Sequence, residues 1–348
     1  MKTISRLKLK SKRILLRVDF NVPIEKDKIL DDFRIKKEIP VIKQLLKKKS
    51  KIILISHLGR PEGSFKKEFS LLPIKNHLKK LLKKEILGPF MLEEATKEIQ
   101  KMKNGSVLML ENIRFYKGEI ENEEDFAKSL SQMGDLFIND AFSVSHRAQA
   151  SITTITKFLP SYAGPNLISE IKNLSKILRK PKRPLVVLIG GKKIEDKTKV
   201  VDKFSECADW VLLGNLVAHE IKKGSVKVKN MSKIIFPFEG KEALDMGENT
   251  IEIFKEKIKI AKTIFWSGPF GKIEDKRYQK GTIEIAKLIV SLHGKVFSVV
   301  GGGDTIEFLN KFSFVKKFDF ISTGGSAMLE FLGGEKLPGL AALGYYGN

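Results

Sequence analysis

The sequence predicts an α/β protein with two doubly wound parallel sheets that are joined by a hinge helix. Short apolar runs alternate with amphipathic helical stretches, and the same order begins again in the second half. This alternation is typical of parallel strands that are covered by helices on both faces. The 348 residues also exceed the usual size of one hydrophobic core. Together these observations predict two Rossmann-like domains.

Strand and helix signals follow one another in a regular order through the first half of the chain. Runs rich in Ile, Leu and Val predict strands, and stretches with apolar residues at helical spacing predict helices. The predicted strands are residues 14–18, 51–55, 106–110 and 136–139, and the predicted helices are residues 36–47, 71–83 and 123–132.

The second half opens with a buried apolar run at residues 185–189. A helical stretch at residues 165–181 precedes this run and ends where Pro181 and Pro184 follow, because proline cannot continue a helix. We interpret the stretch as the connector between the two domains. The further predicted strands are residues 210–213, 233–236, 263–266, 296–300 and 318–321.

The composition excludes several classes of protein. The longest apolar stretches are strand-sized, so a membrane-spanning helix is not expected. The first residues lack the apolar core of a signal peptide, and we expect the protein to stay in the cytoplasm. Cys207 is the single cysteine, which excludes an internal disulfide and a cysteine-based metal cluster.

The chain is strongly basic, with 64 Lys and Arg against 41 Asp and Glu and a net charge of +23, which indicates an anionic partner. Ten of the basic residues are Arg, which leaves 54 Lys, and most Lys lie in runs that we interpret as solvated helix faces. The alternative is a nucleic-acid surface, although aromatic residues are not interleaved with the lysines. Where this Lys-rich chain uses Arg instead, we infer that a planar guanidinium group is needed to bind a carboxylate or phosphate through two hydrogen bonds.

Polar residues follow four predicted strands of the first half, at the edge where ligands bind in open parallel sheets. Their guanidinium groups predict a site for a small polyanion, and Asp19 and Asn21 are suited to orient a substrate hydroxyl. The alternative is a set of unrelated surface ion pairs, with His57 satisfied inside its own turn. We assign His57 to anion contact rather than to acid or base chemistry. The predicted cluster consists of Asp19, Asn21, Arg34, His57, Arg60, Arg114 and Arg147.

Three glycine-containing loops follow predicted strands of the second half and predict a nucleotide site. They are residues 190–197, residues 301–305 and residues 322–326. Glycine lets the backbone approach phosphates at a helix start, and Asp304 is placed to hold Mg²⁺ through oxygen ligands. The alternatives are ordinary strand-to-helix turns, in which Asp304 or Thr305 only caps its helix.

A fourth turn, residues 266–274, follows another predicted strand of this half. Its glycines and proline are turn signals, and Glu274 is a candidate for a ribose hydroxyl or for a neighbouring lysine. The loop at residues 190–197 is not a Walker loop, because the glycine spacing of a Walker loop is longer. A dehydrogenase is also disfavoured, because no G-x-G-x-x-G pattern follows the first strand of either half.

With these motifs in view, the sequence resembles the phosphoglycerate kinase family nearly end to end. The resemblance implies a phosphotransferase that acts reversibly between 1,3-bisphosphoglycerate and ADP, giving 3-phosphoglycerate and ATP in glycolysis or gluconeogenesis. It also implies a nucleotide bound with Mg²⁺, hinge bending, a monomer, and neither a membrane nor a specific nucleic acid as partner. The motifs appear in the family's order: RVDFNVP (17–23), SHLGRP (56–61), ENIRF (111–115), NDAFSVSHRA (139–148), GGGDT (301–305) and LPGLAAL (337–343).

The resemblance implies a division of the chain into an acid-binding domain (1–164, with a C-terminal tail 331–348), a connecting helix (165–181) and a nucleotide-binding domain (182–330). Arg34 and Lys197 are the predicted catalytic residues, because an ionised carboxylate needs positioning and charge neutralisation rather than a base. The implied acid-binding residues are Asp19, Phe20, Asn21, Arg34, His57, Leu58, Gly59, Arg60, Arg114 and Arg147. The implied nucleotide-binding residues are Lys193, Lys197, Gly247, Glu274, Gly302, Gly303, Asp304 and Thr305, with Asp304 also at the metal.

Several segments depart from the family pattern. The usual GGAK loop has Lys192 in place of the small residue, WNGP reads WSGP at residues 266–269, and the last glycine triplet ends in Ser326. The usual GGGMAFTF run is replaced by residues 214–219, and a long segment between there and residues 245–247 is largely missing. These departures lie chiefly on the adenosine side, so we expect altered nucleotide affinity or base preference and an intact acid site.

Two rival functions stay open on the sequence alone. One is a protein of this kind that binds ligand without efficient turnover, which a coupled assay with MgADP would identify. The other is a nucleic-acid-binding protein, which would bind tightly and with a steep dependence on salt.

Overall fold

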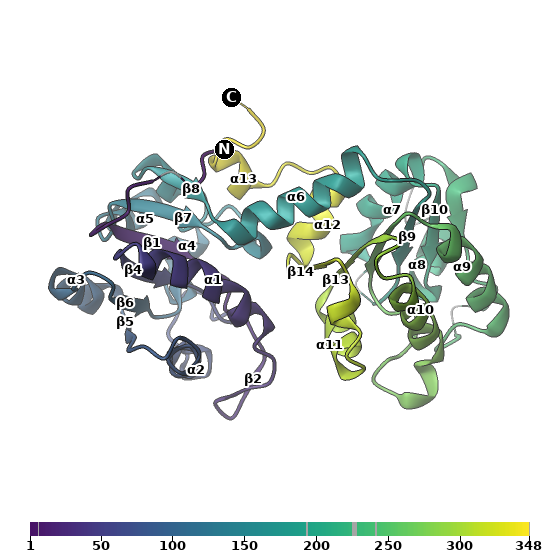
Figure 1. Ribbon diagram of the computed structural model, residues 1–348, viewed down its shortest axis with the longest axis horizontal. Coiled ribbons are helices and arrows are strands. Elements are labelled where there is room, and N and C mark those ends of the chain that lie inside the picture. The colour runs from purple at the N-terminus through teal and green to yellow at the C-terminus, as the bar shows by residue number, and fades with distance from the viewer. Residues whose placement is uncertain (6, 193, 225–227, 241, 348) are drawn as a thin grey trace. The chain divides into compact units, whose positions relative to one another are not determined.

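The computed structural model describes residues 1–5, 7–192, 194–224, 228–240 and 242–347 (Figure 1). The chain divides into two compact units: unit 1 contains Met1–Ser169 and Lys336–Asn348, and unit 2 contains Glu170–Glu335. The helix α6 (Pro165–Arg179) therefore begins in unit 1 and continues into unit 2. Among the described residues, no helix is both long and apolar enough to cross a membrane.

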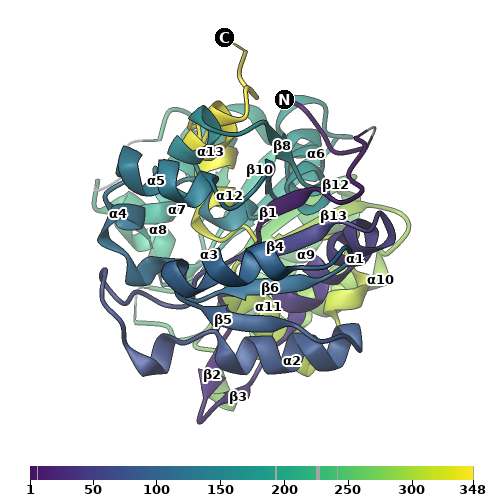
Figure 2. The ribbon, with the colours of Figure 1, turned by 90° about the vertical axis from the view of Figure 1, so that its left-hand side faces the viewer.

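Unit 1 is built around a six-stranded parallel sheet with the order β5-β6-β4-β1-β7-β8, and Figure 2 shows β5, β6, β4 and β1 side by side. Its strands are β1 (Arg13–Arg17), β4 (Lys51–Ile55), β5 (Leu87–Phe90), β6 (Val107–Leu110), β7 (Leu136–Asn139) and β8 (Ser161–Ala163). Its helices are α1 (Phe33–Lys47), α2 (Leu72–Leu82), α3 (Leu92–Lys101), α4 (Lys117–Ile120), α5 (Glu124–Ser131) and α13 (Pro338–Ala342). A small antiparallel hairpin pairs β2 (Ile24–Glu25) with β3 (Lys28–Ile29).

The two faces of this sheet lie in two separate cores. Alternate residues of β1 point to opposite faces, so Ile14 and Leu16 belong to one apolar cluster and Leu15 to the other. Strand β4 divides in the same way, with Ile52 in the first cluster and Ile53 in the second. Burial on both faces explains why these strands are continuous apolar runs in the sequence.

Unit 2 repeats the architecture with the strand order β11-β10-β9-β12-β13-β14, and its neighbouring strands are also parallel. The strands are β9 (Leu185–Ile189), β10 (Trp210–Leu213), β11 (Ile234–Ile235), β12 (Thr263–Ser267), β13 (Phe297–Gly301) and β14 (Phe320–Ser322). The helices are α7 (Glu195–Cys207), α8 (Asn215–Lys222), α9 (Glu248–Ile260), α10 (Lys280–Ser291), α11 (Gly303–Lys311) and α12 (Ser326–Leu332). The predicted fold class is thus confirmed.

The hairpin strands β2 and β3 were not predicted, and neither were two strands of the six-stranded sheet of unit 1. Strand β5 contains Gly88 and Pro89, two residue types that are depleted in strands, and all of its residues are only partly buried. Strand β8 has three residues, too few for a periodic signal. Both pair at the ends of the sheet order, where the sequence pattern is weakest.

Candidate active site

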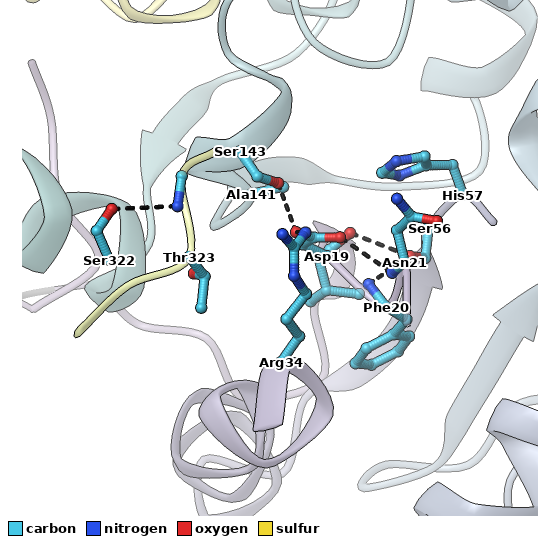
Figure 3. A network of polar contacts seen from close by, with 12 residues as sticks. Asp19, Phe20, Asn21, Arg34, Ser56, His57, Ala141, Ser143, Ser322 and Thr323 are labelled. Atoms are coloured by element: carbon cyan, nitrogen blue, oxygen red, sulfur yellow. Dashed lines mark hydrogen bonds and ion pairs between the residues drawn. The ribbon is translucent and has the colours of Figure 1, made fainter. Parts of the chain in front are cut away.

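The loop after β1 carries Asp19, which organises the polar edge of unit 1 (Figure 3). One carboxylate oxygen pairs with Arg34 of α1 and accepts a hydrogen bond of 2.5 Å from the Ser143 hydroxyl. The other oxygen accepts from the backbone N–H of Asn21 at 3.0 Å, and the Asn21 side-chain oxygen accepts from the N–H of Gly59 at 3.0 Å. The structure thus brings the predicted residues Asp19, Asn21 and Arg34 together, and it adds Ser143, which the sequence analysis did not single out.

Phe20 and Leu58 have a different position from the polar residues of this edge. Both side chains are buried in the core of unit 1. The backbone N–H of Phe20 donates to the Ser56 hydroxyl at 3.0 Å. Any contact of Phe20 or Leu58 with a ligand would come from the backbone, and their side chains serve packing.

Arg17 lies fully buried beneath the site and is fixed by the protein itself. Its Nε donates to the Ser151 hydroxyl at 3.0 Å and one Nη to the Val18 carbonyl at 2.8 Å. The Ser151 hydroxyl and N–H in turn donate to the buried Glu119 carboxylate, each at 2.7 Å. We therefore interpret Arg17 as a residue that positions its neighbours and does not contact the ligand.

His57 is buried beside these arginines. Burial first, and then Arg114, Arg17 and the arginines at 34 and 147, hold the pKa of His57 well below its usual value, so the ring is neutral near pH 7. The second Nη of Arg17 lies 3.4 Å from Nδ1 of His57. Because an arginine can only donate, Nδ1 is the acceptor and the ring proton resides on Nε2. The uncharged His57 ring can donate a hydrogen bond to an anion through Nε2–H, but it adds no positive charge to the site.

Arg114 lies nearly buried among other arginines of unit 1. Burial, and next the charges of Arg17 and Arg147, lower the pKa of Arg114 to about 10. One Nη donates to the Gly59 carbonyl at 2.9 Å, while the buried Nε has no hydrogen-bond partner among the described residues. An anion would relieve this repulsion between like charges. The adjoining cavity of about 310 Å³ is lined by Arg60, Glu62, Arg114, Lys117, Ile120, Glu121, Arg147 and Gln149.

Hydrogen bonds from glycine N–H groups join the strand ends of unit 2. The N–H of Gly190, after β9, donates to the Ser267 carbonyl at 2.9 Å, and the N–H of Gly268, after β12, donates to the Thr305 hydroxyl at 2.9 Å. Gly268 has φ of +90°, and a Cβ there would collide with the Gly190 carbonyl. Glycine is therefore required by close backbone approach.

Basic side chains meet these loops from two directions. Lys197 of α7 is buried, and its ammonium donates to the Gly190 carbonyl. The ammonium of Lys192 lies 2.7 Å from the Glu274 carboxylate, so one of the two roles predicted for Glu274, the contact with a lysine, is present. Lys193 lies outside the described residues.

The glycine loop after β13 begins α11. Gly302 is the N-cap residue with φ of +93°, and no side chain caps this helix. Asp304 is exposed in the first turn, while Thr305 is buried and accepts from Gly268. The alternative in which Asp304 or Thr305 serves as the cap is therefore wrong. Gly303 and its neighbours present the N-terminal end of α11, where backbone N–H groups favour anions.

The other predicted nucleotide elements have structural anchors. Gly247 is the N-cap residue of α9. The third glycine loop is tied to α6, because Glu170 accepts from the Ser322 hydroxyl at 2.7 Å and from the Thr323 N–H at 2.8 Å. At the start of α8, the Asn215 amide donates to the carbonyls of residues 243 and 245 at 3.0 and 3.2 Å. The segment that departs from the family pattern is thus a packed helix start.

The oxygen ligands of unit 2 suit a metal ion that binds together with the phosphates of a nucleotide. Within the described residues, no group of three or more His, Cys, Asp or Glu side chains could hold a metal ion. Mg²⁺ is commonly held by one or two carboxylates together with substrate phosphates. The exposed Asp304 carboxylate at the helix start fits that arrangement and does not fit a metal held by protein alone.

Two parallel α/β units, one with an arginine-lined anion cavity and one with glycine loops at its strand ends, define a phosphotransferase class. The sequence profile described as Phosphoglycerate kinase matches residues 4–229 and 215–335. The phosphoglycerate kinase of Pseudothermotoga lettingae is 38% identical, with 98% of each chain covered, and that of Dictyoglomus turgidum is 39% identical, with 96% of each covered. The chain belongs to the phosphoglycerate kinase family, and the rival functions are not favoured.

Solved structures agree with this assignment. The phosphoglycerate kinase of Coxiella burnetii has a TM-score of 0.83 at 31% identity over 99% of each chain. That of Pyrococcus horikoshii has a TM-score of 0.86 at 28% identity, covering 99% of this chain and 98% of its own. The alignment with the P. lettingae relative spans 390 positions against 348 residues here, so at least 42 positions have no counterpart in this chain. The two profile matches overlap at residues 215–229, which indicates an interruption of the family pattern near α8.

Proposed function

We propose that the chain moves a phosphoryl group between 1,3-bisphosphoglycerate and ADP, giving 3-phosphoglycerate and ATP, with the acid in unit 1 and the nucleotide in unit 2. The observation that carries the proposal is the cavity of about 310 Å³ lined by Arg60, Arg114 and Arg147. Three guanidinium groups suit the phosphate of a small multiply charged acid, because each can form two parallel hydrogen bonds.

The reaction needs no general base. In the direction of ATP consumption, a carboxylate oxygen of the acid attacks the γ-phosphorus, a new P–O bond forms, and ADP leaves with the electrons of the broken bond. The carboxylate is already ionised at neutral pH, so catalysis consists of positioning and charge neutralisation. We assign the neutralisation to Arg34, oriented by the carboxylate of Asp19, and to Lys197.

Arg34 and Lys197 belong to different units. The proposal therefore requires that the two bound ligands be brought together and that water be excluded, since water would hydrolyse the acyl phosphate. We propose hinge bending for this step and a cytoplasmic monomer as the working form. Asp304 would hold Mg²⁺, which would add charge neutralisation at the phosphates.

The direct test is the formation of ATP from MgADP and 1,3-bisphosphoglycerate by the purified chain, followed by a coupled assay. GDP is run in parallel, because residues 214–219 replace the usual run on the adenosine side. We expect turnover with ADP. Binding of both ligands without turnover would contradict the proposed catalytic role of Arg34 and Lys197.

A further inference from the structure

Lys192 is a charged residue in the loop after β9, directly after the paired glycines Gly190 and Gly191. Its Nζ lies 2.7 Å from an oxygen of Glu274, in the turn after β12. The two side chains are 65% and 58% exposed. An ion pair this exposed contributes little to folding stability, so stability does not account for the lysine.

The position of Lys192 suggests a different role. Strand β9 is hydrogen-bonded to β12, and β12 to β13, so the segments that follow three neighbouring strands carry Lys192, Glu274 and Asp304 in turn. Glu274, and more weakly Asp304, raise the pKa of Lys192. The ammonium therefore lies within the electrostatic field of the carboxylates on both neighbouring loops.

An ammonium group has three donors, and the contact with Glu274 uses one of them. The side chain is long and mobile enough to keep or exchange that contact when an anion arrives. The backbone N–H groups at the start of α11 also favour an anion at this edge. A polyphosphate held there would meet the charge of Lys192 in addition to that of Lys197.

We propose that Lys192 is a nucleotide-affinity residue of this chain, which binds the polyphosphate of ADP or ATP while its contact with Glu274 keeps the ammonium over the site. The inference rests on the proposed function, in which unit 2 binds the nucleotide.

The test compares the dissociation constants of ADP and adenosine for the wild-type chain and for Lys192→Met, measured by calorimetry and competition. Met keeps the length of the stem and removes the charge. Lys192→Arg is the conservative variant. The matched control is Lys199→Met, because Lys199 is 64% exposed and lies 2.8 Å from Glu335, in an ion pair of the same kind.

We expect Lys192→Met to weaken ADP binding by about three- to tenfold at low salt, as one exposed charge close to an anion would. The difference should disappear at about 1 M salt, where charges are screened within about 3 Å. Adenosine binding should not change, Lys192→Arg should bind ADP like wild type, and Lys199→Met should have no effect.

Unchanged ADP affinity in Lys192→Met would overturn the inference, and so would an equal loss for ADP and adenosine, because that would place the effect at the ribose. In both cases a wild-type chain that binds ADP leaves the proposed function intact. A wild-type chain that binds no ADP would overturn the inference and the proposed function together.

Discussion

The two candidate sites carry positive charge in different ways. In unit 1, Arg17 is fully buried and Arg114 is 7% exposed, and both are fixed by hydrogen bonds. In unit 2, the loops are shaped by glycine backbones, and Lys192 is 65% exposed. The buried charge of Arg114 is repelled by the charges of Arg17 and Arg147, so an anion beside Arg114 would lower the free energy of unit 1. In unit 2, the shape of the loops depends on the path of the backbone, such as the close approach of Gly268 to Gly190.

The largest expected effect comes from removing one positive charge from the candidate site of each unit. Arg34→Ala and Lys197→Ala should each lower kcat by about 10²–10³, because each removes charge stabilisation from the transition state. The coupled assay measures kcat, and circular dichroism serves as the control for folding. Near-normal turnover in both variants would show that neither residue neutralises the migrating group.

The backbone of unit 2 can be tested with one methyl group. Gly268→Ala should destabilise the protein by about 3 kcal/mol or more, because its Cβ meets the Gly190 carbonyl and φ is +90°. Nucleotide binding should fall, while binding of 3-phosphoglycerate should stay within about twofold. Calorimetry of unfolding and of binding measures these effects.

Gly294→Ala is the matched control, since Gly294 has φ of +81° and nothing within 4 Å of an added Cβ. It should cost about 1 kcal/mol through the backbone conformation alone. An equal loss of stability in the two variants would mean that the close approach of Gly268 to Gly190 has no special part in unit 2.

Removing the buried charge of Arg114 in unit 1 should weaken ligand binding with little effect on the free energy of unfolding. Arg114→Met should weaken 3-phosphoglycerate binding by about 100-fold. Its effect on stability should stay within about 1 kcal/mol, because the removed cation is desolvated and repelled by Arg17 and Arg147. The exposed Arg277, paired with Asp275, offers Arg277→Met as a control that should change neither. A large loss of stability without a loss of binding would reverse the comparison.

A pair of buried acids in unit 1 predicts the smallest effect. Burial raises the pKa of Asp140 to about 6, and burial together with Asp140 raises the pKa of Glu38 well above its usual value. A raised folded pKa means that the protonated form is favoured, so this contribution to stability is present below about pH 4 and is lost as the pH rises through 6.

Glu38→Gln keeps a hydrogen-bonding amide and removes one titrating group. We expect it to stabilise the protein by about 1–2 kcal/mol at pH 8 and to match wild type near pH 4. Urea unfolding at the two pH values measures the difference. A gain at pH 4 that is absent at pH 8 would contradict the direction of these pKa shifts.

Much of the fold followed from the sequence, because strands buried on both faces are continuous apolar runs that punctuate the chain. The sequence also predicted Asp19, Arg34 and Arg114 as members of one cluster, and the structure places Asp19 against Arg34 and Arg114 against Gly59, whose N–H donates to Asn21. The sequence did not separate Arg17, a buried support, from Arg114, which lines the cavity, because burial depends on tertiary packing. For the same reason the sequence did not show that the Thr305 hydroxyl accepts a hydrogen bond from the Gly268 N–H, and the predicted ligand contact of Thr305 stays a prediction.

Other residues of the sites gave no local signal. Lys117 and Gln149 line the arginine cavity from segments without a strand-end position. The contact between Lys192 and Glu274 joins residues that are far apart in the chain and adjacent only because β9 and β12 are neighbours in the sheet. Such neighbours follow from strand order, which a single sequence does not state.

The chain path through the two units has a consequence for synthesis. Unit 1 is interrupted by all of unit 2 and receives α13 only afterwards, where the Gly339 N–H donates to the Ser145 carbonyl at 2.9 Å. During synthesis on the ribosome, α13 can therefore pack against the rest of unit 1 only after all of unit 2 has been synthesised. Nascent chains stopped before Lys336 would hold an unfinished first unit beside a second unit whose whole sequence has been made.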